Sequence, residues 1–449
     1  FECGETTLEG LVAGMPLRHV LELTGIDFPA IALTPPMQVR LADGTTLTRY
    51  QDLDRWIAEA ERVFGHSTAQ RAFWEFCYEI SRFVWDTSLR YRAFPPSSIG
   101  DLFDALPNVR PHQFLKARYA FHTMDGLLKK FGLFENQRFV SFVNEQLLIT
   151  AQNTISEVNV LFGATALCYT NYTNYYVPGG LIKLANAFTD YIKAQGSRVI
   201  CRTTVESIER LNPRGRKNAG GFRVRAGSRE FLADRVISGV PIQNTLELVD
   251  DARLTKRYKK NALPSAKLWS AFSMGLAFRG APAGDPRLLH YQLHLKTPLP
   301  TIGARSIFVS LSPPDDTDRG PEGHTIASVS THITDPERHA ELPAEEIAEM
   351  ILDAIYDAGI FTREQLVYQH FSTPRTWQQW TRRKFGFVGG HPQFRSIKPW
   401  AMLDARLSGG LYQCGDTAYP GQGIPGACLS GIVAAHKLLR DAPTKAKNS

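Results

Sequence analysis

The stretch 411–431 constrains this chain most, because it dictates a strand, a tight glycine-rich turn and a helix in quick succession. It reads L-Y-Q-C-G-D-T-A-Y-P-G-Q-G-I-P-G-A-C-L-S-G. Its first four residues, 411–414, predict a short strand, which ends just before Asp416. Apolar residues recur at helical spacing over 427–439 and predict a helix. Pro425 suits the first turn of that helix, where its missing N–H group costs nothing.

Such a junction is suited to holding a ligand. Glycines let the backbone approach a ligand closely, and the free N–H groups of a first helical turn face electron-rich groups. Asp416, at the end of the strand, can accept hydrogen bonds from ligand hydroxyls. Gly421, Gly423 and Gly426 also match G-x-G-x-x-G, but no second strand follows, so this is not the first turn of a dinucleotide-binding unit. An ordinary strand-to-helix turn is the alternative on pattern alone.

Composition narrows the class of protein. A chain of 449 residues can bury a large core and favours two domains. The net charge of +7 suits an anionic cofactor or an anionic membrane surface. The sequence has no basic run interleaved with aromatic residues, so nucleic-acid binding is not predicted. Six scattered cysteines without a C-x-x-C motif are typical of reduced thiols in a cytoplasmic protein. No apolar run is long enough to span a bilayer, and His290 and His294 lie in a strand-like stretch, so no metal site is predicted.

The motif G-D-T-A-Y-P-G-Q-G-I-P-G-A-C-L-S-G resembles the C-terminal flavin motif of the phytoene desaturase and carotenoid isomerase family, which is similar in fold to the flavin amine oxidases. The resemblance implies FAD as cofactor and an α/β fold: a Rossmann-like FAD-binding domain with an α+β substrate domain. It places Asp416 at the ribityl–phosphate region and the start of the helix against the pyrimidine ring. The cofactor-binding residues implied in this motif are Gly415, Asp416, Gly421, Gly423, Ile424 and Pro425.

The first residues, F-E-C-G-E-T-T-L, resemble the family segment F-D-x-G-x-T-x-L that passes beside the flavin. Gly4 and Thr6 are therefore candidate cofactor-binding residues, with an irregular surface loop as the alternative. The chain starts at Phe1, and no strand followed by G-x-G-x-x-G precedes this segment. We therefore expect that the first βαβ unit is missing, that the chain begins inside a longer protein, and that it binds FAD weakly or is inactive by itself.

A second FAD segment is implied by V-P-G-G followed by a helix over 181–194. The apolar stretch 197–202 predicts a strand, and 234–239 predicts a buried strand. In the family a valine pairs through its backbone with the adenine ring, and here that residue is Val205, for which a core valine is the alternative. Two further strands are predicted at 222–226 and 230–232.

The remaining patterns divide the chain. A hairpin with an Asp-Gly turn is predicted over 38–48, and apolar helices lie between 52 and 150. These helices fit a lid over an apolar channel, a patch on a membrane surface, or ordinary core packing. Alternating residues predict an antiparallel sheet in a substrate domain. The expected parts are an N-terminal FAD-domain remnant with the hairpin at 1–50, a helical lid at 51–170, FAD-binding segments at 171–250 and 395–449, and the substrate domain at 251–394.

No nucleophile elbow, Walker turn or H-E-x-x-H motif occurs, so no catalytic side chain is predicted. This suits a flavoenzyme, in which the cofactor supplies the redox chemistry. The resemblance implies hydride transfer from a long apolar polyene or lipid to the flavin, or isomerisation of its double bonds, with peripheral membrane association and an open choice of electron acceptor. A flavin amine oxidase, with Lys267 as a remote candidate lysine, and a cofactor-free lipid-binding protein are the alternatives. The candidate substrate residues are Tyr175, Tyr176, Trp380 and Phe387.

Overall fold

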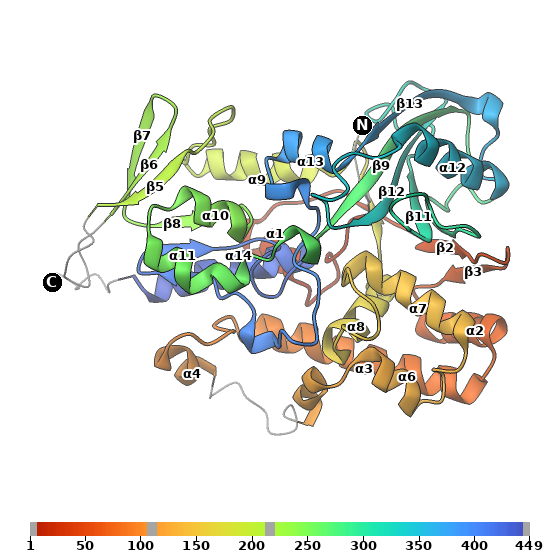
Figure 1. Ribbon diagram of the computed structural model, residues 1–449, viewed down its shortest axis with the longest axis horizontal. Coiled ribbons are helices and arrows are strands. Elements are labelled where there is room, and N and C mark those ends of the chain that lie inside the picture. Colours follow the sequence, from red (N-terminus) through yellow and green to blue (C-terminus); the bar gives the residue numbers. More distant parts are fainter. Residues whose placement is uncertain (1–6, 106–114, 212–220, 443–449) are drawn as a thin grey trace.

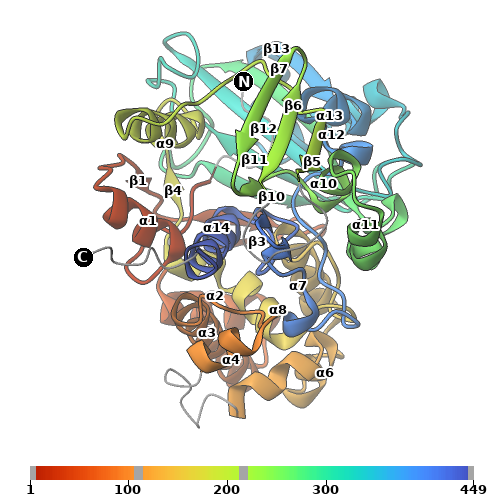
Figure 2. The same cartoon turned by 90° about the vertical axis from the view of Figure 1, so that its left-hand side faces the viewer.

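The computed structural model describes residues 7–105, 115–211 and 221–442. Its elements form a large sheet, a layer of helices beneath that sheet, and a smaller α/β part around helix α14 (Ile424–Arg440), as Figure 1 shows. Figure 2 looks along α14, with α1 (Pro16–Thr24) beside it, α9 (Ile182–Ala194) higher up and the helical layer below. The helix therefore lies where the three parts meet.

The large sheet has seven strands in the order β13-β9-β12-β11-β10-β2-β3. Neighbours run antiparallel except for β10 and β2, which pair in parallel. The predicted hairpin is confirmed, but its strands complete this sheet. The strands are β2 (Met37–Arg40), β3 (Thr46–Arg49), β9 (Trp269–Arg279), β10 (His290–His294), β11 (Ser306–Leu311), β12 (His324–Thr334) and β13 (Leu366–Ser372).

Helix α12 (Ala344–Asp357) belongs to the same core as this sheet. Its Ile347, Ile351 and Ile355 are fully buried in the cluster that contains Phe278. Each such side chain contributes about 1.5–3 kcal/mol relative to an exposed one. The acidic residues of its first turn face solvent, where they complement the positive end of the helix.

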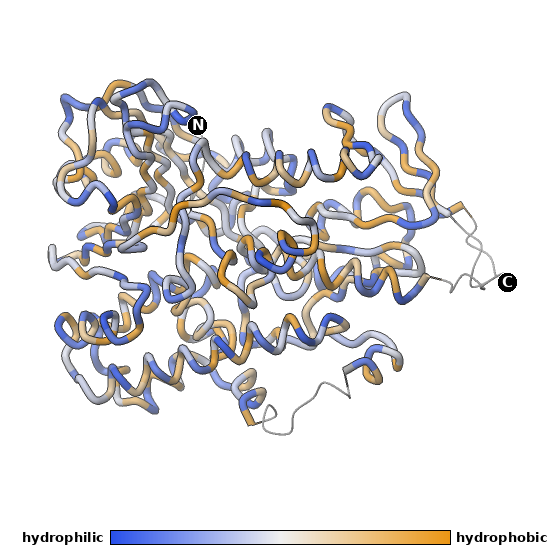
Figure 3. The backbone as a smooth tube through the Cα atoms, turned by 180° about the vertical axis from the view of Figure 1, so that it is seen from behind, coloured by the Kyte–Doolittle hydropathy of each residue, from blue (hydrophilic) through white to orange (hydrophobic). Residues whose placement is uncertain are grey.

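The helical layer is held by an aromatic core. The rings of Trp56 and Trp74 meet edge to face, with centroids 4.9 Å apart. Asp52 and Asn136 cap α2 (Leu53–Phe64) and α7 (Gln137–Thr150) by accepting hydrogen bonds from backbone N–H groups. Apolar and polar residues alternate along these helices, as Figure 3 shows. The helices are α2 (Leu53–Phe64), α3 (Ser67–Arg90), α6 (Met124–Lys130), α7 (Gln137–Thr150) and α8 (Val160–Leu167).

Arg49, at the end of β3, joins the large sheet to the helical layer. Its guanidinium group lies 4.1 Å from the ring centroid of Trp56 and donates hydrogen bonds to Gln146 Oε1 (2.8 Å) and the Leu167 carbonyl (2.6 Å). Burial lowers the pKa of Arg49 to about 10, so the group stays charged at neutral pH. Gln146 Nε2 in turn donates to Gln292 Oε1 on β10. The helical layer is therefore hydrogen-bonded to two strands of the large sheet, β3 and β10.

The smaller α/β part contains a sheet of order β14-β15-β8, in which β15 and β8 pair in parallel. A second sheet, β5-β6-β7, projects at its edge. The strands are β5 (Ser207–Arg210), β6 (Phe222–Ala226), β7 (Arg229–Ala233), β8 (Val236–Ser238), β14 (Arg406–Ser408) and β15 (Leu411–Gln413). The short helices α10 (Ile242–Leu248) and α11 (Ala252–Tyr258) follow β8.

The structure corrects two predictions about elements and adds a helix. No strand forms over 197–202, where Val199 and Ile200 are 36% and 40% exposed, because no described strand offers this stretch a backbone partner. The strand predicted as buried over 234–239 shrinks to β8, and Ile237 is 43% exposed at its open edge. Helix α8 was not predicted, although Asn159 caps it and an apolar run follows.

A network of buried charges fixes helix α4 (Ile99–Ala105) to α14. Asp101, 1% exposed, receives Arg406 Nη1 at 2.7 Å. Lys437 of α14 is fully buried; its Nζ donates to the Pro95 carbonyl at 2.7 Å and pairs with Asp404. Burial by itself would raise the pKa of Asp101, but bonds from Arg406 and backbone N–H groups, together with the charge of Lys437, lower it to about 2.

Candidate functional site

The glycine-rich turn between β15 and α14 has the geometry that its sequence predicts. Gly415, Gly421 and Gly423 have φ angles of 96°, 120° and 81°, a region that favours glycine. Gly423 is the N-cap of α14 and no side chain caps the helix, while Pro425 occupies its first turn. The first N–H groups of the helix are therefore open to a ligand.

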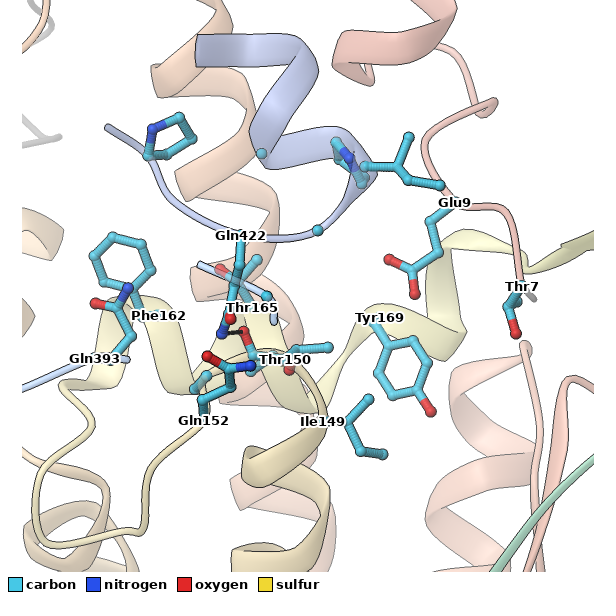
Figure 4. A pocket seen from close by; sticks show the side chains of 18 of the residues that line it. Thr7, Glu9, Ile149, Thr150, Gln152, Phe162, Thr165, Tyr169, Gln393 and Gln422 are labelled. Atoms are coloured by element: carbon cyan, nitrogen blue, oxygen red, sulfur yellow. Dashed lines mark hydrogen bonds between the residues drawn. The ribbon is translucent and has the colours of Figure 1, made fainter. Parts of the chain in front are cut away.

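The mouth of α14 opens onto a cavity of about 510 Å³, shown in Figure 4. This volume lies within the usual range of small-molecule sites, roughly 300–1,000 Å³. Residues Gly423, Ile424, Pro425 and Gly426 form one wall. The mouth of the helix is thus not closed by side chains, and a flat ligand has room in front of it.

Side chains from distant segments form the other walls. Most are apolar or aromatic, and Glu9 is the only Asp, Glu, Lys or Arg side chain among the described residues that line the cavity. The helical layer contributes α3, the end of α7 and α8, and the sheet contributes β9, β11 and β12. The larger apolar members are Val84, Trp85, Ile149, Phe162, Tyr169, Tyr172, Leu181, Phe308, Trp377 and Val388.

The turn at Gly389 and Gly390 passes very close to the flavin motif. A Cβ atom at Gly390 would lie 2.3 Å from the Asp416 carbonyl oxygen, which leaves no room for a side chain. Arg383 holds the turn in place, since it donates to the Gly389 carbonyl at 2.7 Å and forms an ion pair with Asp416 at 3.0 Å. The Gly390 N–H group also donates to Gln422 Oε1 at 3.2 Å.

The C-terminal end of α7 is fixed to the same turns. Gln422 Nε2 donates to the Thr150 carbonyl, and the Gln393 N–H group donates to the Ala151 carbonyl at 3.0 Å. Carbonyls at a helix end otherwise lack partners. The end of α7 therefore becomes part of the cavity wall, next to the mouth of α14.

His332 of β12 lines the cavity but carries no charge. It lies edge to face against Trp269 and Phe308. Burial lowers its pKa to about 4, so the ring is neutral at physiological pH. It is therefore a weak base and extends the uncharged surface of the cavity.

The predicted cofactor residues fall into three groups. Gly423, Ile424 and Pro425 line the cavity. Gly415, Asp416, Gly421 and Val205 do not line the cavity. Asp416 forms an ion pair with Arg383, and Val205 is 37% exposed in a stretch without secondary structure. Gly4 and Thr6 lie outside the described residues. The cofactor roles of all these residues, including those that line the cavity, stay predictions.

None of the four candidate substrate residues is among those that line the cavity. Tyr175 pairs with β1 (Ile31–Ala32) through β4 (Tyr175–Tyr176), and Tyr176 donates to Asp316. Trp380 of α13 (Pro374–Thr381) is 79% exposed, and Phe387 is fully buried in another cluster.

Trp377, one turn before Trp380, does reach the cavity, and sequence analysis missed it. It also missed Thr150 and Gln152. The available signal was the sequence T-A-Q-N, which carries three polar residues across the end of the helix 137–150.

The residues present fit a flavin ring. The uncapped amides of α14 suit the electron-rich pyrimidine edge, and the glycines at 389 and 390 keep side chains off the adjoining face. Beside these glycines, the buried Oε1 atom of Gln152 has no hydrogen-bond partner. Buried polar atoms are almost always paired, so a ligand is the expected partner of this oxygen. No cluster of three potential metal ligands occurs among the described residues.

Comparison with known proteins agrees with this geometry. Prolycopene isomerase 1 from an Oncidium hybrid cultivar is 24% identical over 98% of this chain and 76% of its own length. Prolycopene isomerase from Arabidopsis thaliana is 23% identical over 95% and 72%. The structure of a putrescine oxidase double mutant shares the fold, with a TM-score of 0.59 and 13% identity over 98% of this chain and 88% of that one. Residues 55–439 match the family of flavin containing amine oxidoreductases. The chain therefore belongs to this family of flavin-dependent enzymes.

Proposed function

We propose that the protein binds FAD and rearranges the double bonds of a long apolar polyene, by isomerisation or by desaturation. The observation that carries this proposal is the mostly apolar cavity of about 510 Å³ at the mouth of α14. Burying a hydrocarbon in such a cavity is favourable, at about 25 cal/mol per Å² of apolar surface. The similarity to prolycopene isomerases over almost the whole chain supports isomerisation in particular.

The chain's own residues bind and orient. A bound flavin supplies hydride transfer to and from an unsaturated hydrocarbon. The amides of Gly423 and Ile424 would hold its pyrimidine edge. Trp85, Phe162 and Trp377 would exclude water from the polyene. Isomerisation has no net redox change, whereas desaturation removes two hydrogens and requires an electron acceptor.

The amine oxidase alternative has less support. A charged amine would enter a cavity in which Glu9 is the one carboxylate among the described lining residues, and that carboxylate accepts from Asn174 at 3.4 Å. Lys267 is exposed beside Phe394 and does not line the cavity. Cys414 does not line the cavity either, and burial raises the pKa of its thiol, which makes a covalent flavin bond unfavourable there.

Purified protein supplied with FAD and a reductant should change the cis/trans isomer composition of prolycopene in detergent micelles. Chromatography of the polyene measures this, and a sample without FAD is the control. Production of hydrogen peroxide from amines, with the polyene unchanged, would favour the amine oxidase. Prolycopene that is bound but unaltered with FAD present would favour the lipid-binding alternative.

An apolar substrate dissolves in membranes, and we propose that the enzyme works at a membrane surface as a peripheral protein. No helix of the described part is long and apolar enough to cross a bilayer. A set of exposed apolar side chains lies on α4, on the segment 115–121 and at Trp400, and the ring centroids of Phe121 and Trp400 are 5.2 Å apart. We name this set the lower apolar surface, and it consists of Ile99, Leu102, Phe103, Leu115, Phe121 and Trp400.

Position and charge support this role. The helix α4 and the segment 115–121 both lie on the lower side of the molecule in Figures 1 and 2. Lys398 lies 5.6 Å from the ring of Phe121, and Arg118 and Lys130 are exposed nearby, around Tyr119. Basic residues next to exposed apolar ones are typical of binding to anionic lipid, at about 1 kcal/mol per charge. The 3₁₀ helix Arg118–Phe121 packs on α8, which lines the cavity on its other side.

Replacing Phe103 and Phe121 together by serine should weaken binding to phosphatidylserine vesicles about tenfold, since two rings would no longer insert into the bilayer. Vesicle co-sedimentation measures this. The matched control is Leu232→Ser, because Leu232 is 70% exposed on β7, away from this surface. Equal vesicle binding by the Phe103/Phe121 variant and by Leu232→Ser would contradict the assignment to a membrane. If the Phe103/Phe121 variant kept vesicle binding but lost binding to a protein, the surface would be a protein-docking surface.

A further inference from the structure

Gln152, between α7 and α8, is held in a strained conformation inside the wall of the cavity. Its φ angle is 49°, and its side chain is among the buried ones at 4% exposure. Residues other than glycine rarely adopt this left-handed region, because it is strained for them. A buried polar residue that keeps this conformation calls for a functional explanation.

The hydrogen bonds of Gln152 fix the orientation of its amide. Nε2 donates to the Val388 carbonyl at 3.0 Å, a bond that the amide oxygen cannot make. Oε1 is therefore the free end of the side chain, and it is buried without a partner. An unpaired buried acceptor destabilises the protein unless a ligand pairs with it.

A second unpaired group lies on the same wall. Thr150 Oγ1 is buried without a partner and its residue lines the cavity, while the carbonyl of Thr150 is already taken by Gln422. Figure 4 shows Thr150, Gln152 and Gln422 together on one side of the cavity. Gly389 completes this wall, since a Cβ atom there would lie 2.1 Å from Gln152 Nε2.

We propose that Gln152 and Thr150 form a polar subsite that binds an N–H or O–H donor of the molecule held in the cavity. Gln152 Oε1 accepts the hydrogen bond, and the Thr150 hydroxyl can donate to or accept from the same group. This inference rests on the proposed function for the identity of the occupant. The donor is either the N–H group of the flavin pyrimidine ring or the hydroxyl of an oxygenated polyene.

Gln152→Met tests the subsite, because methionine keeps the length of the side chain but removes the acceptor. The matched control is Gln243→Met. Gln243 is also 4% exposed, its Nε2 donates to the Leu263 carbonyl at 3.3 Å, and its Oε1 also lacks a partner, but it does not line the cavity. Both variants lose a buried amide with an unpaired oxygen, and Gln243→Met also loses the contact of Nε2 with His391 Nε2 at 3.0 Å. A larger effect on ligand binding at Gln152 therefore reports the ligand. Thermal unfolding followed by circular dichroism checks that both fold.

Two measurements distinguish the sources of the donor. If the flavin ring is bound, Gln152→Met should shift the absorption spectrum of added FAD and raise its Kd about tenfold relative to Gln243→Met. If a hydroxyl is bound, FAD binding stays equal, and retinol should bind about tenfold more weakly while axerophthene, the hydrocarbon without the hydroxyl, binds as before. Quenching of the fluorescence of Trp85 and Trp377 reports polyene binding.

Equal behaviour of the two variants in both measurements would overturn the proposal and make the Gln152 amide a purely structural group. Failure of the proposed function looks different. In that case FAD binds neither the variants nor the unaltered protein, and the comparison of retinol with axerophthene decides on the subsite alone.

Discussion

Gly426→Ala is expected to abolish stable flavin binding and to destabilise the protein. A Cβ atom at this position would lie 2.6 Å from the Gly421 carbonyl oxygen and 3.2 Å from its carbon. Backbone atoms cannot rotate away as a side chain does, and Gly421 is itself held at a φ of 120°. The turn must therefore open, and the amides of Gly423 and Ile424 must move with it.

Two measurements check this result. Overpacking of this kind costs about 1–3 kcal/mol in the free energy of unfolding, which urea titration measures. The Kd for FAD should rise by roughly a hundredfold if the displaced amides no longer bind the ring. Equilibrium dialysis and the absorption spectrum of the flavin report this binding.

Gly431→Ala is the matched control on the same helix. It lies five residues later, and a Cβ atom there meets nothing within 4 Å. Alanine should stabilise the helix by about 0.5–1 kcal/mol at this position and leave FAD binding unchanged. Equal FAD binding by the two variants would show that the mouth of α14 is not the flavin site.

Local sequence was sufficient to predict some elements of this structure. The turn at 415–426 was predictable because its glycines and Pro425 specify backbone geometry over a few residues. The hairpin β2–β3 was predictable for the same reason. In both cases the residues that decide the structure are neighbours in the sequence.

The remaining walls of the cavity depend on tertiary packing. Thr150 and Gln152 reach the site only because the end of α7 accepts hydrogen bonds from Gln422 and Gln393, which lie more than two hundred residues later in the sequence. No periodic pattern encodes such a meeting. The unpaired oxygen of Gln152 is visible only once its neighbours are in place.

The candidate substrate residues illustrate the same limit. Tyr175, Tyr176 and Phe387 are aromatic and close in sequence to glycine motifs, but hydrogen bonds and other clusters hold them away from the cavity. Trp377 reaches the cavity, whereas Trp380 on the next turn faces solvent. The strand expected at 197–202 does not form, because an apolar run becomes a strand only where a neighbouring strand pairs with its backbone.

Lys437→Met is expected to lower the free energy of unfolding by about 3 kcal/mol, because it removes one partner of a buried ion pair. The side chain of Lys437 is fully buried, with Nζ 4.0 Å from Asp101 and in closer contact with Asp404. Methionine fills similar space but leaves Asp404, whose Oδ2 already lacks a partner, without a cation. Urea titration of the folded protein measures the loss, and Leu439→Met, at a 70% exposed position of the same helix, is the control.

The dependence on pH identifies the charge as the cause. Asp101 has a folded-state pKa of about 2 against an ordinary value of 3.8, so its contribution is complete above 3.8 and is lost as the pH falls towards 2. Without the positive charge of Lys437 the pKa of Asp101 rises, and acid unfolding of Lys437→Met should therefore begin at a higher pH. The double variant Lys437→Met with Asp404→Asn should lose less free energy of unfolding than the two single variants lose together, since each single change already breaks the same ion pair. Additive losses, with an unchanged acid transition, would mean that Lys437 acts through packing and that its charge does not hold α4 against α14.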